Sequence, residues 1–166
     1  MAQADFDNPV VAEIEQQDVS SQVHVAGHPI HAMTVSFPIA LVISTLGADM
    51  LFWWSGDPFW ARAALWSSFF AFAMGVLAAL SGTAELLLVK GIRTRSASWS
   101  HAVAAMTLIA IAGANWIFRV GDHEAAVLPV GLFLSLLGSV FVGVTGWHGG
   151  KLVFDHGIGM RISNND

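Results

Sequence analysis

The sequence predicts an all-α protein, an antiparallel bundle of four transmembrane helices. Three observations carry this prediction: 55% of the 166 residues are hydrophobic, only 11% are charged, and the mean hydropathy is +0.63. The apolar runs are longer than about 18 residues, the length at which a helix can cross a bilayer. Because of these runs, the expected environment is the lipid bilayer. The net charge of −5 leaves nucleic acid no basic patch to bind.

The first element, residues 1–26, is expected to be an acidic N-terminal tail. Its first 22 residues contain no Lys or Arg, and they carry five acids: Asp5, Asp7, Glu13, Glu15 and Asp18. A segment of this composition has little apolar surface to bury. Because the basic n-region of a secretory signal is missing, the tail is not interpreted as one.

The membrane domain is expected over residues 27–160, followed by a short C-terminal tail over residues 161–166. Its four predicted spans are 30–54, 60–89, 98–119 and 126–150. At about 1.5 Å per residue, each span exceeds the ~30 Å hydrocarbon layer. The connections SGDP, KGIRTRSA and VGDHEA are short, which makes helices that are neighbours in sequence antiparallel.

The basic residues predict the orientation in a bacterial inner membrane. Five lie on the face shared by both termini and the middle loop: Lys90, Arg93, Arg95, Lys151 and Arg161. Arg62 and Arg119 lie toward the opposite face. The positive-inside rule therefore predicts that both termini are cytoplasmic. On the opposite face, Asp49, Asn115, Arg62 and Arg119 are expected to form a polar clasp between spans.

The histidines gather on one predicted face of the membrane. Only His123 is expected on the other side from the remaining six: His24, His28, His31, His101, His148 and His156. Pro29 suits the first turn of a helix, so His31 is expected within the first turn of the first span. Ser98 is the expected N-cap of the third span, which places His101 at a similar depth.

An acidic side chain, Glu85, is predicted about one turn from the same end of the second span. A carboxylate inside a span is costly unless it is paired, so Glu85 is a candidate functional residue. The alternative is an ion pair with Lys90 or Arg93 at the membrane surface.

Four segments of the chain resemble one known family. They are GHPIHAMTVSFPIAL, SGTAELL, SHAV and GWHGGKLVFDHGIGM, and they resemble the domain-of-unknown-function family 2231 of bacterial four-helix membrane proteins over roughly residues 27–160. Members are sometimes joined to Rieske-type or other redox modules, and no activity is established for the family. The resemblance assigns pattern positions to His28, His31, Glu85, His101 and His156, whereas His148 stands where the pattern has an apolar residue.

Histidines from several spans predict a redox centre. Because the chain has no cysteine, thiolate-ligated clusters and covalent haem attachment are excluded. Two imidazoles on facing helices can hold a b-type haem, and His31 and His101 are the expected axial pair, with His28, His156 and His148 as further candidates. A zinc, iron or copper ion bound by His28, His31, His101, His156 and Glu85 is the alternative cofactor.

The leading hypothesis is therefore a membrane electron-transfer protein that exchanges electrons with a redox partner near the cytoplasmic face. Two alternatives stay open: a non-catalytic anchor subunit of a larger redox complex, and a proton or ion pathway suggested by Glu85 and Asp49. The sequence does not distinguish a homo-oligomer from a hetero-oligomer.

Overall fold

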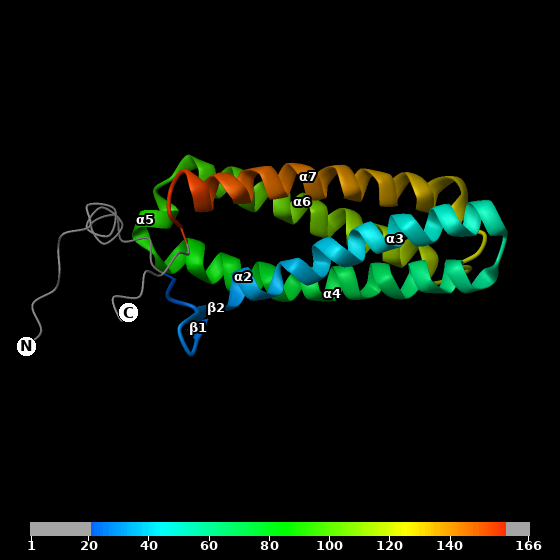
Figure 1. Ribbon diagram of the computed structural model, residues 1–166, viewed down its shortest axis with the longest axis horizontal. Coiled ribbons are helices and arrows are strands. Elements are labelled where there is room, and N and C mark those ends of the chain that lie inside the picture. Colours follow the sequence, from blue (N-terminus) through cyan, green and yellow to red (C-terminus); the bar gives the residue numbers. More distant parts are fainter. Residues whose placement is uncertain (1–20, 159–166) are drawn as a thin grey trace, which may run out of the picture.

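Four long helices form an up-and-down bundle in the computed structural model, which describes residues 21–158 (Figure 1). The first span is divided into α2 and α3, and a short helix α5 joins the second and third spans. The helices are α2 (Ile30–Thr34), α3 (Ser36–Ser55), α4 (Pro58–Leu88), α5 (Lys90–Arg93), α6 (Ser96–Arg119), η1 (Val127–Gly131) and α7 (Leu132–Phe154).

The packing order closes the bundle into a ring. Helix α3 packs on α4 and α7, and α6 packs on the same two helices. Four segments are long and apolar enough to cross a membrane: Ile30–Ser55, Pro58–Leu88, Ser96–Arg119 and Val127–Phe154. The predicted all-α four-helix bundle is confirmed, although the third span begins at Ser96, two residues before the expected N-cap Ser98.

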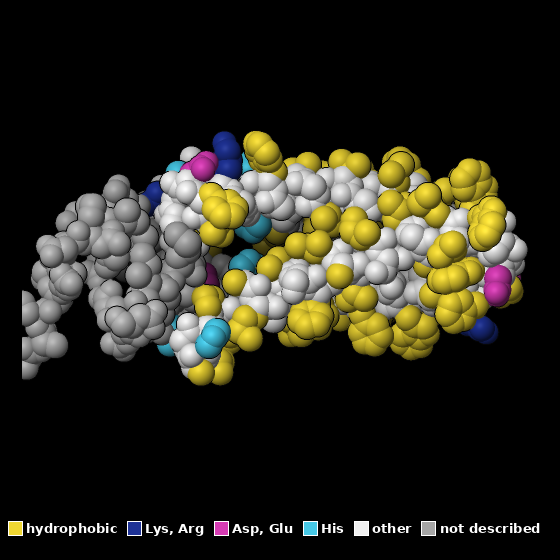
Figure 2. Space-filling model, viewed as in Figure 1, with side chains coloured by type: hydrophobic (Ala, Val, Ile, Leu, Met, Phe, Trp, Pro, Cys, Tyr) yellow, Lys and Arg dark blue, Asp and Glu magenta, His cyan; other side chains and the backbone are white. Residues whose placement is uncertain are grey.

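The outer surface of the bundle is apolar along its length, as Figure 2 shows. Large side chains stand exposed on every long helix, among them Trp54 at 83%, Leu88 at 69%, Ile117 at 65% and Trp147 at 70%. Exposed apolar surface on this scale is not found on soluble monomers, and lipid is the solvent that suits it. The chain is a multi-pass membrane protein.

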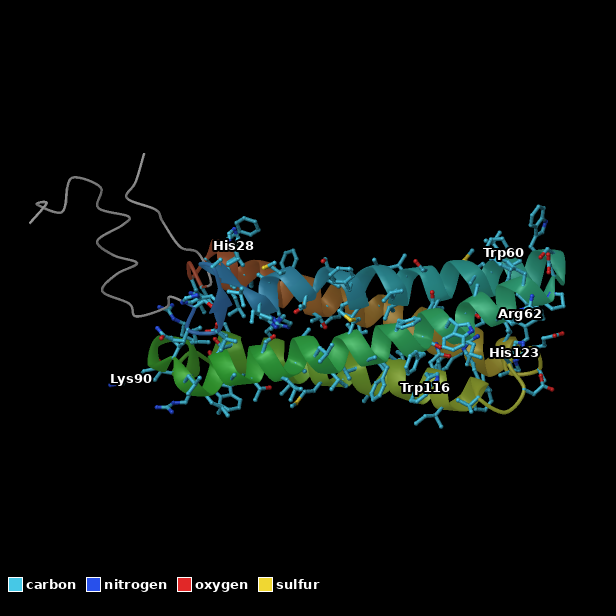
Figure 3. All side chains as sticks on the ribbon, turned by 90° about the horizontal axis from the view of Figure 1, so that it is seen from below. His28, Trp60, Arg62, Lys90, Trp116 and His123 are labelled. Carbon is cyan, nitrogen blue, oxygen red and sulfur yellow. The ribbon has the colours of Figure 1, made fainter. Side chains whose placement is uncertain are left out.

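The two ends of the bundle differ in their polar residues (Figure 3). His28 and Lys90 lie at the end that carries both termini of the described chain, while Arg62 and His123 lie at the other. This separation agrees with the predicted topology, in which only His123 lies across the membrane from the other histidines.

Residues 21–29 dock against the bundle, although residues 1–26 were expected to form a tail. Strands β1 (His24–Val25) and β2 (His28–Pro29) pair in a two-stranded hairpin. Ala26 and Gly27 form its turn with φ of 50° and 81°, the left-handed conformation that such two-residue turns need. The Ile30 N–H then donates to the Val23 carbonyl at 3.1 Å, which fixes the start of α2. The rest of the expected tails, residues 1–20 and 161–166, lies outside the described residues.

Small residues line the interior of α4 and α7 at alternating spacings of three and four residues. In α4 the buried positions include Ala61, Ala64, Ser68, Ala71, Gly75, Ala78 and Glu85. Such a spacing averages 3.5 residues and gives left-handed packing, while the small side chains let backbones approach closely.

The buried positions of the two halves of the chain correspond at constant spacings. Residues of α3 have buried counterparts in α6 that lie 70 residues later: Pro38 and Leu108, Val42 and Ala112, Thr45 and Asn115, Asp49 and Arg119. Residues of α4 have buried counterparts 67 residues later in η1 and α7: Ala64 and Gly131, Ser68 and Ser135, Ala71 and Gly138, Ala78 and Thr145, Glu85 and Leu152. The bundle is thus two helical hairpins with a common pattern of buried positions, although the paired residues are mostly of different types.

One pair of counterparts forms a buried ion pair near the end remote from the termini. Arg119 donates from both terminal nitrogens to the two carboxylate oxygens of Asp49 at 2.8 and 2.7 Å, and neither side chain is exposed. Asn115 accepts from Arg119 Nε at 2.9 Å and donates to Ser135 Oγ at 3.0 Å. The predicted clasp therefore contains Asp49, Asn115 and Arg119. Arg62 was wrongly included, because its side chain is exposed.

Candidate functional site

A cavity of about 360 Å³ lies between the two hairpins near the end that carries the termini. Figure 2 shows histidine side chains in the hollow at this end. Both hairpins line the cavity with equivalent positions, which are His31 and His101, Ala32 and Ala102, Val35 and Ala105, Ala79 and Gly146, Gly82 and Gly149, Thr83 and Gly150, and Glu85 and Leu152. The cavity is therefore approximately two-fold symmetric in the positions that form it.

His31 projects from the first turn of α2 onto α4. Its Nδ1 lies 2.8 Å from the Ala78 carbonyl oxygen. The backbone of Gly82 makes room for the ring, because a Cβ at this position would lie only 2.7 Å from Nδ1 of His31. A glycine one turn beyond the acceptor carbonyl thus lets the imidazole lie directly against the helix.

His101 repeats this arrangement in the second hairpin. Its Nδ1 lies 3.2 Å from the carbonyl oxygen of Thr145, and a Cβ on Gly149 would lie 3.1 Å from Cε1 of the ring. Gly149 follows Thr145 by four residues, as Gly82 follows Ala78. Each histidine on the first helix of a hairpin is therefore held by a carbonyl and a glycine on the second.

The two imidazoles face one another across the cavity. Their ring centres are 6.3 Å apart and their planes are almost perpendicular, at 87°. A carbonyl oxygen can only accept, so each neutral ring carries its proton on Nδ1 and has a lone pair on Nε2. Within residues 21–158 neither Nε2 has a hydrogen-bond partner. A backbone carbonyl on one imidazole nitrogen is the usual support for a histidine that binds metal through the other.

Two hydroxyl groups of the cavity wall have no partner within the described chain. Ser98 Oγ and Thr145 Oγ1 are buried and make no hydrogen bond. Buried hydroxyls are almost always bonded, and an unbonded one points to a missing water, ion or ligand. Both oxygen atoms are shielded from the cavity by the surrounding atoms, so the unbonded hydroxyls lie in its wall but not on its surface.

Glu85 contributes to the cavity wall, but its carboxylate is bonded to the N-terminal segment. It accepts from the backbone N–H groups of Gln22 and Val23 at 3.1 and 2.8 Å and from the hydroxyl of Ser21. The carboxylate therefore makes neither of the contacts expected from the sequence. In the described chain it is not grouped with other metal ligands, and it is not paired with Lys90 or Arg93.

The remaining candidate histidines do not line the cavity. His28 is exposed and its Nδ1 lies 3.0 Å from the Ala26 carbonyl oxygen, while Nδ1 of His156 lies 3.2 Å from a terminal nitrogen of Arg95. His148 is half-buried on α7, next to the cavity residue Gly149. Over residues 21–158, no three His, Asp or Glu side chains are grouped so that they could hold a metal ion. Of the predicted ligands, the structure brings together only His31 and His101.

Sequence reasoning missed the residues that hold the two rings in place. Gly82 and Gly149 were not singled out, and neither were the carbonyls of Ala78 and Thr145. A usable signal was present, since the dipeptide His-Ala occurs at residues 31–32 and 101–102 and a glycine follows by 51 residues in the first hairpin and by 48 in the second. Without the structure, nothing connects these positions.

The fold and cavity define a class of protein, a four-helix integral membrane bundle with a histidine-lined internal cavity. Residues 27–161 match the model of a family described as predicted membrane protein (DUF2231), and the chain belongs to that family. No curated protein and no solved structure matches the chain.

Proposed function

We propose that this protein is a membrane electron carrier that binds a b-type haem between His31 and His101. The observation that carries the proposal is the facing pair of imidazoles, each fixed at Nδ1 by a carbonyl and each with a free Nε2. When bound, haem supplies a one-electron iron couple, and the two histidines set its potential through their basicity. The electrons would pass to and from a partner at the end of the bundle that carries the termini.

The spacing of the rings supports ligation of a single ion. Metal–imidazole bonds of about 2.0–2.1 Å, with just over 1 Å from nitrogen to ring centre, put the centres of two opposed rings about 6.4 Å apart. The centres of His31 and His101 are 6.3 Å apart. The separation of the ring centres is therefore that of two imidazoles that bind one ion between them.

The number of ligands favours haem over a bare metal ion. Haem needs only two axial ligands, because the macrocycle fills the other positions. A tetrahedral zinc site needs four ligands, and a histidine-ligated zinc, iron or copper ion would have to recruit further groups that the described chain does not place beside the two rings. The cavity is partly open at its flanks, where a macrocycle bound between the rings would extend out of it.

The experiment is an absorption and metal analysis of the protein purified in mild detergent from cells supplied with haem precursor and iron. We expect one b-type haem per chain, with the ferric low-spin EPR signal of high anisotropy that perpendicular imidazole planes produce. Zinc or copper at one equivalent without haem would support the alternative cofactor. Protein that contains neither haem nor metal under any growth condition would refute both.

We also propose a bacterial inner-membrane location with both termini in the cytoplasm. Lys90, Arg93 and Lys151 are exposed at the end that carries the termini, whereas Arg119 is buried in its ion pair and adds no charge to the opposite surface. Reporter fusions at Asn165 and Ser55 should give cytoplasmic and periplasmic signals, respectively. The reverse result would invert the assignment.

A further inference from the structure

Among the equivalent cavity positions of the two hairpins, one carries a carboxylate in the first hairpin and an apolar side chain in the second. Glu85 in the first hairpin corresponds to Leu152 in the second, and both side chains are buried. A buried carboxylate needs hydrogen-bond donors or a cation, and in the described chain Glu85 has no salt bridge. Its hydrogen-bond donors in the described chain are all on residues 21–23.

These bonds hold residues 21–23 across the end of the cavity that faces the membrane surface. Ser21 is itself part of the cavity wall, and Val23 is bonded onward to the first residue of α2. From the other hairpin, Ile158 covers the same end, where it packs against Leu86, Val89 and Ile92. The segments before the first span and after the last span thus both contribute wall residues at this end of the cavity.

The flanks of the cavity are less covered than its end. On one flank, Ala32 of α2 and Gly146 of α7 are exposed wall residues. On the other, Thr83 of α4 and Met106 of α6 are exposed wall residues. Met106 is ten residues into α6, about 15 Å along the helix at the usual rise and thus at the depth of the acyl chains. These flanks face lipid.

We infer that the occupant of this cavity is a lipid-soluble molecule with polar substituents, which enters between the hairpins from the bilayer. Glu85 closes the aqueous end of the cavity, because its hydrogen bonds hold residues 21–23 there. The apolar flanks admit an apolar ring system or chain, and the Nε2 atoms of His31 and His101, which have no partner in the described chain, are available to its polar groups. This inference concerns the same cavity as the proposed haem, but it does not require the occupant to be haem.

The absence of cysteine makes the route of entry measurable. A single reporter, Ala105→Cys, is placed in the cavity wall, and Thr94→Cys serves as an exposed reference near the membrane surface. Each variant, reconstituted in lipid vesicles, is labelled with a charged, membrane-impermeant maleimide and with an apolar maleimide. The readout is the labelling rate of the charged reagent divided by that of the apolar reagent. This ratio is used because an occupant of the cavity slows both reagents alike.

We expect the charged reagent to be strongly disfavoured at Ala105→Cys but not at Thr94→Cys. Adding Glu85→Leu, the residue that the other hairpin carries, should raise the ratio at Ala105→Cys at least about tenfold, since a hydrogen bond to a charged group is worth about a decade or more in an equilibrium constant. Ser21→Ala, which keeps Glu85, should raise it less and provides a test that does not depend on folding of the leucine variant.

Two results would overturn the inference. One is a ratio at Ala105→Cys equal to that at Thr94→Cys when Glu85 is intact, because the cavity would then be open to water. The other is a ratio that neither Glu85→Leu nor Ser21→Ala changes in folded protein. Failure to find haem would leave both measurements valid, so the two proposals are separable.

Discussion

Replacing either His31 or His101 with alanine is expected to abolish bound haem. Each substitution removes one of the two proposed ligands, and no three His, Asp or Glu side chains in the described chain are grouped so that they could hold a metal in its place. The remaining imidazole would hold the group from one hairpin only. The measurement is the haem content per folded chain, from the absorption of the reduced protein and from size-exclusion chromatography.

Matched controls separate loss of a ligand from loss of the fold. His123 lies at the other end of the bundle, and His28 is an exposed ring bonded only to the Ala26 carbonyl. The variants His123→Ala and His28→Ala should therefore keep full haem content. Gly82→Ala should lower affinity by about 10–100-fold, as the loss of an outer support for a ligand does. Gly143→Ala meets no atom within 4 Å and should have no effect. Equal haem content in all six variants, including His31→Ala and His101→Ala, would exclude this site.

The second large effect is expected at the buried ion pair. Asp49→Ala leaves the charge of Arg119 unpaired in the interior, where neither side chain is exposed. Loss of one partner of a buried pair costs about 3–5 kcal/mol, whereas an exposed charge such as Arg62 contributes little. We therefore expect Asp49→Ala to lower the free energy of unfolding strongly and Arg62→Ala to leave it nearly unchanged, as measured by denaturant unfolding in detergent.

A double substitution tests the cause of that loss. Asp49→Leu with Arg119→Met removes both charges and retains apolar volume, so it should recover much of the stability that Asp49→Ala loses. A double variant as unstable as Asp49→Ala would show that the hydrogen bonds to Asn115 and Ser135, and not the unpaired charge, dominate. Haem content should follow folding in these variants, because the pair lies outside the cavity wall.

The sequence predicted the arrangement of the helices because the signals for it are local. Runs of apolar residues with short polar connections fix the number of spans and their antiparallel order, and Pro29 places His31 in the first turn of α2. The gathering of histidines at one end follows from the same spans. The third span begins at Ser96, earlier than expected. Ser98 is not the N-cap but a buried residue of the first turn, among those that line the cavity.

The hydrogen-bond partners of His31, His101 and Glu85 could not be predicted, because they are mostly backbone groups and lie far away in the sequence. His31 is bonded to a carbonyl 47 residues later and His101 to one 44 residues later, and a carbonyl has no sequence signature. Glu85 is bonded to residues 62 to 64 positions earlier, so its nearest cations in the sequence were a misleading guide.

By itself, the sequence determined a four-helix membrane bundle and the end of it where imidazoles collect, since hydropathy and helix periodicity act over a few turns. It also favoured His31 and His101 as a pair, because each begins a span at a similar depth, but only the tertiary structure decided how close the rings come and which other histidines stay apart from them. Helix packing brings positions 70 residues apart, His31 and His101, to a ring separation of 6.3 Å, and it leaves His28 and His156 bonded elsewhere. The physical reason is that the cavity lies between two hairpins. The small residues that line it are on both hairpins, and they leave space only once the helices have packed against each other.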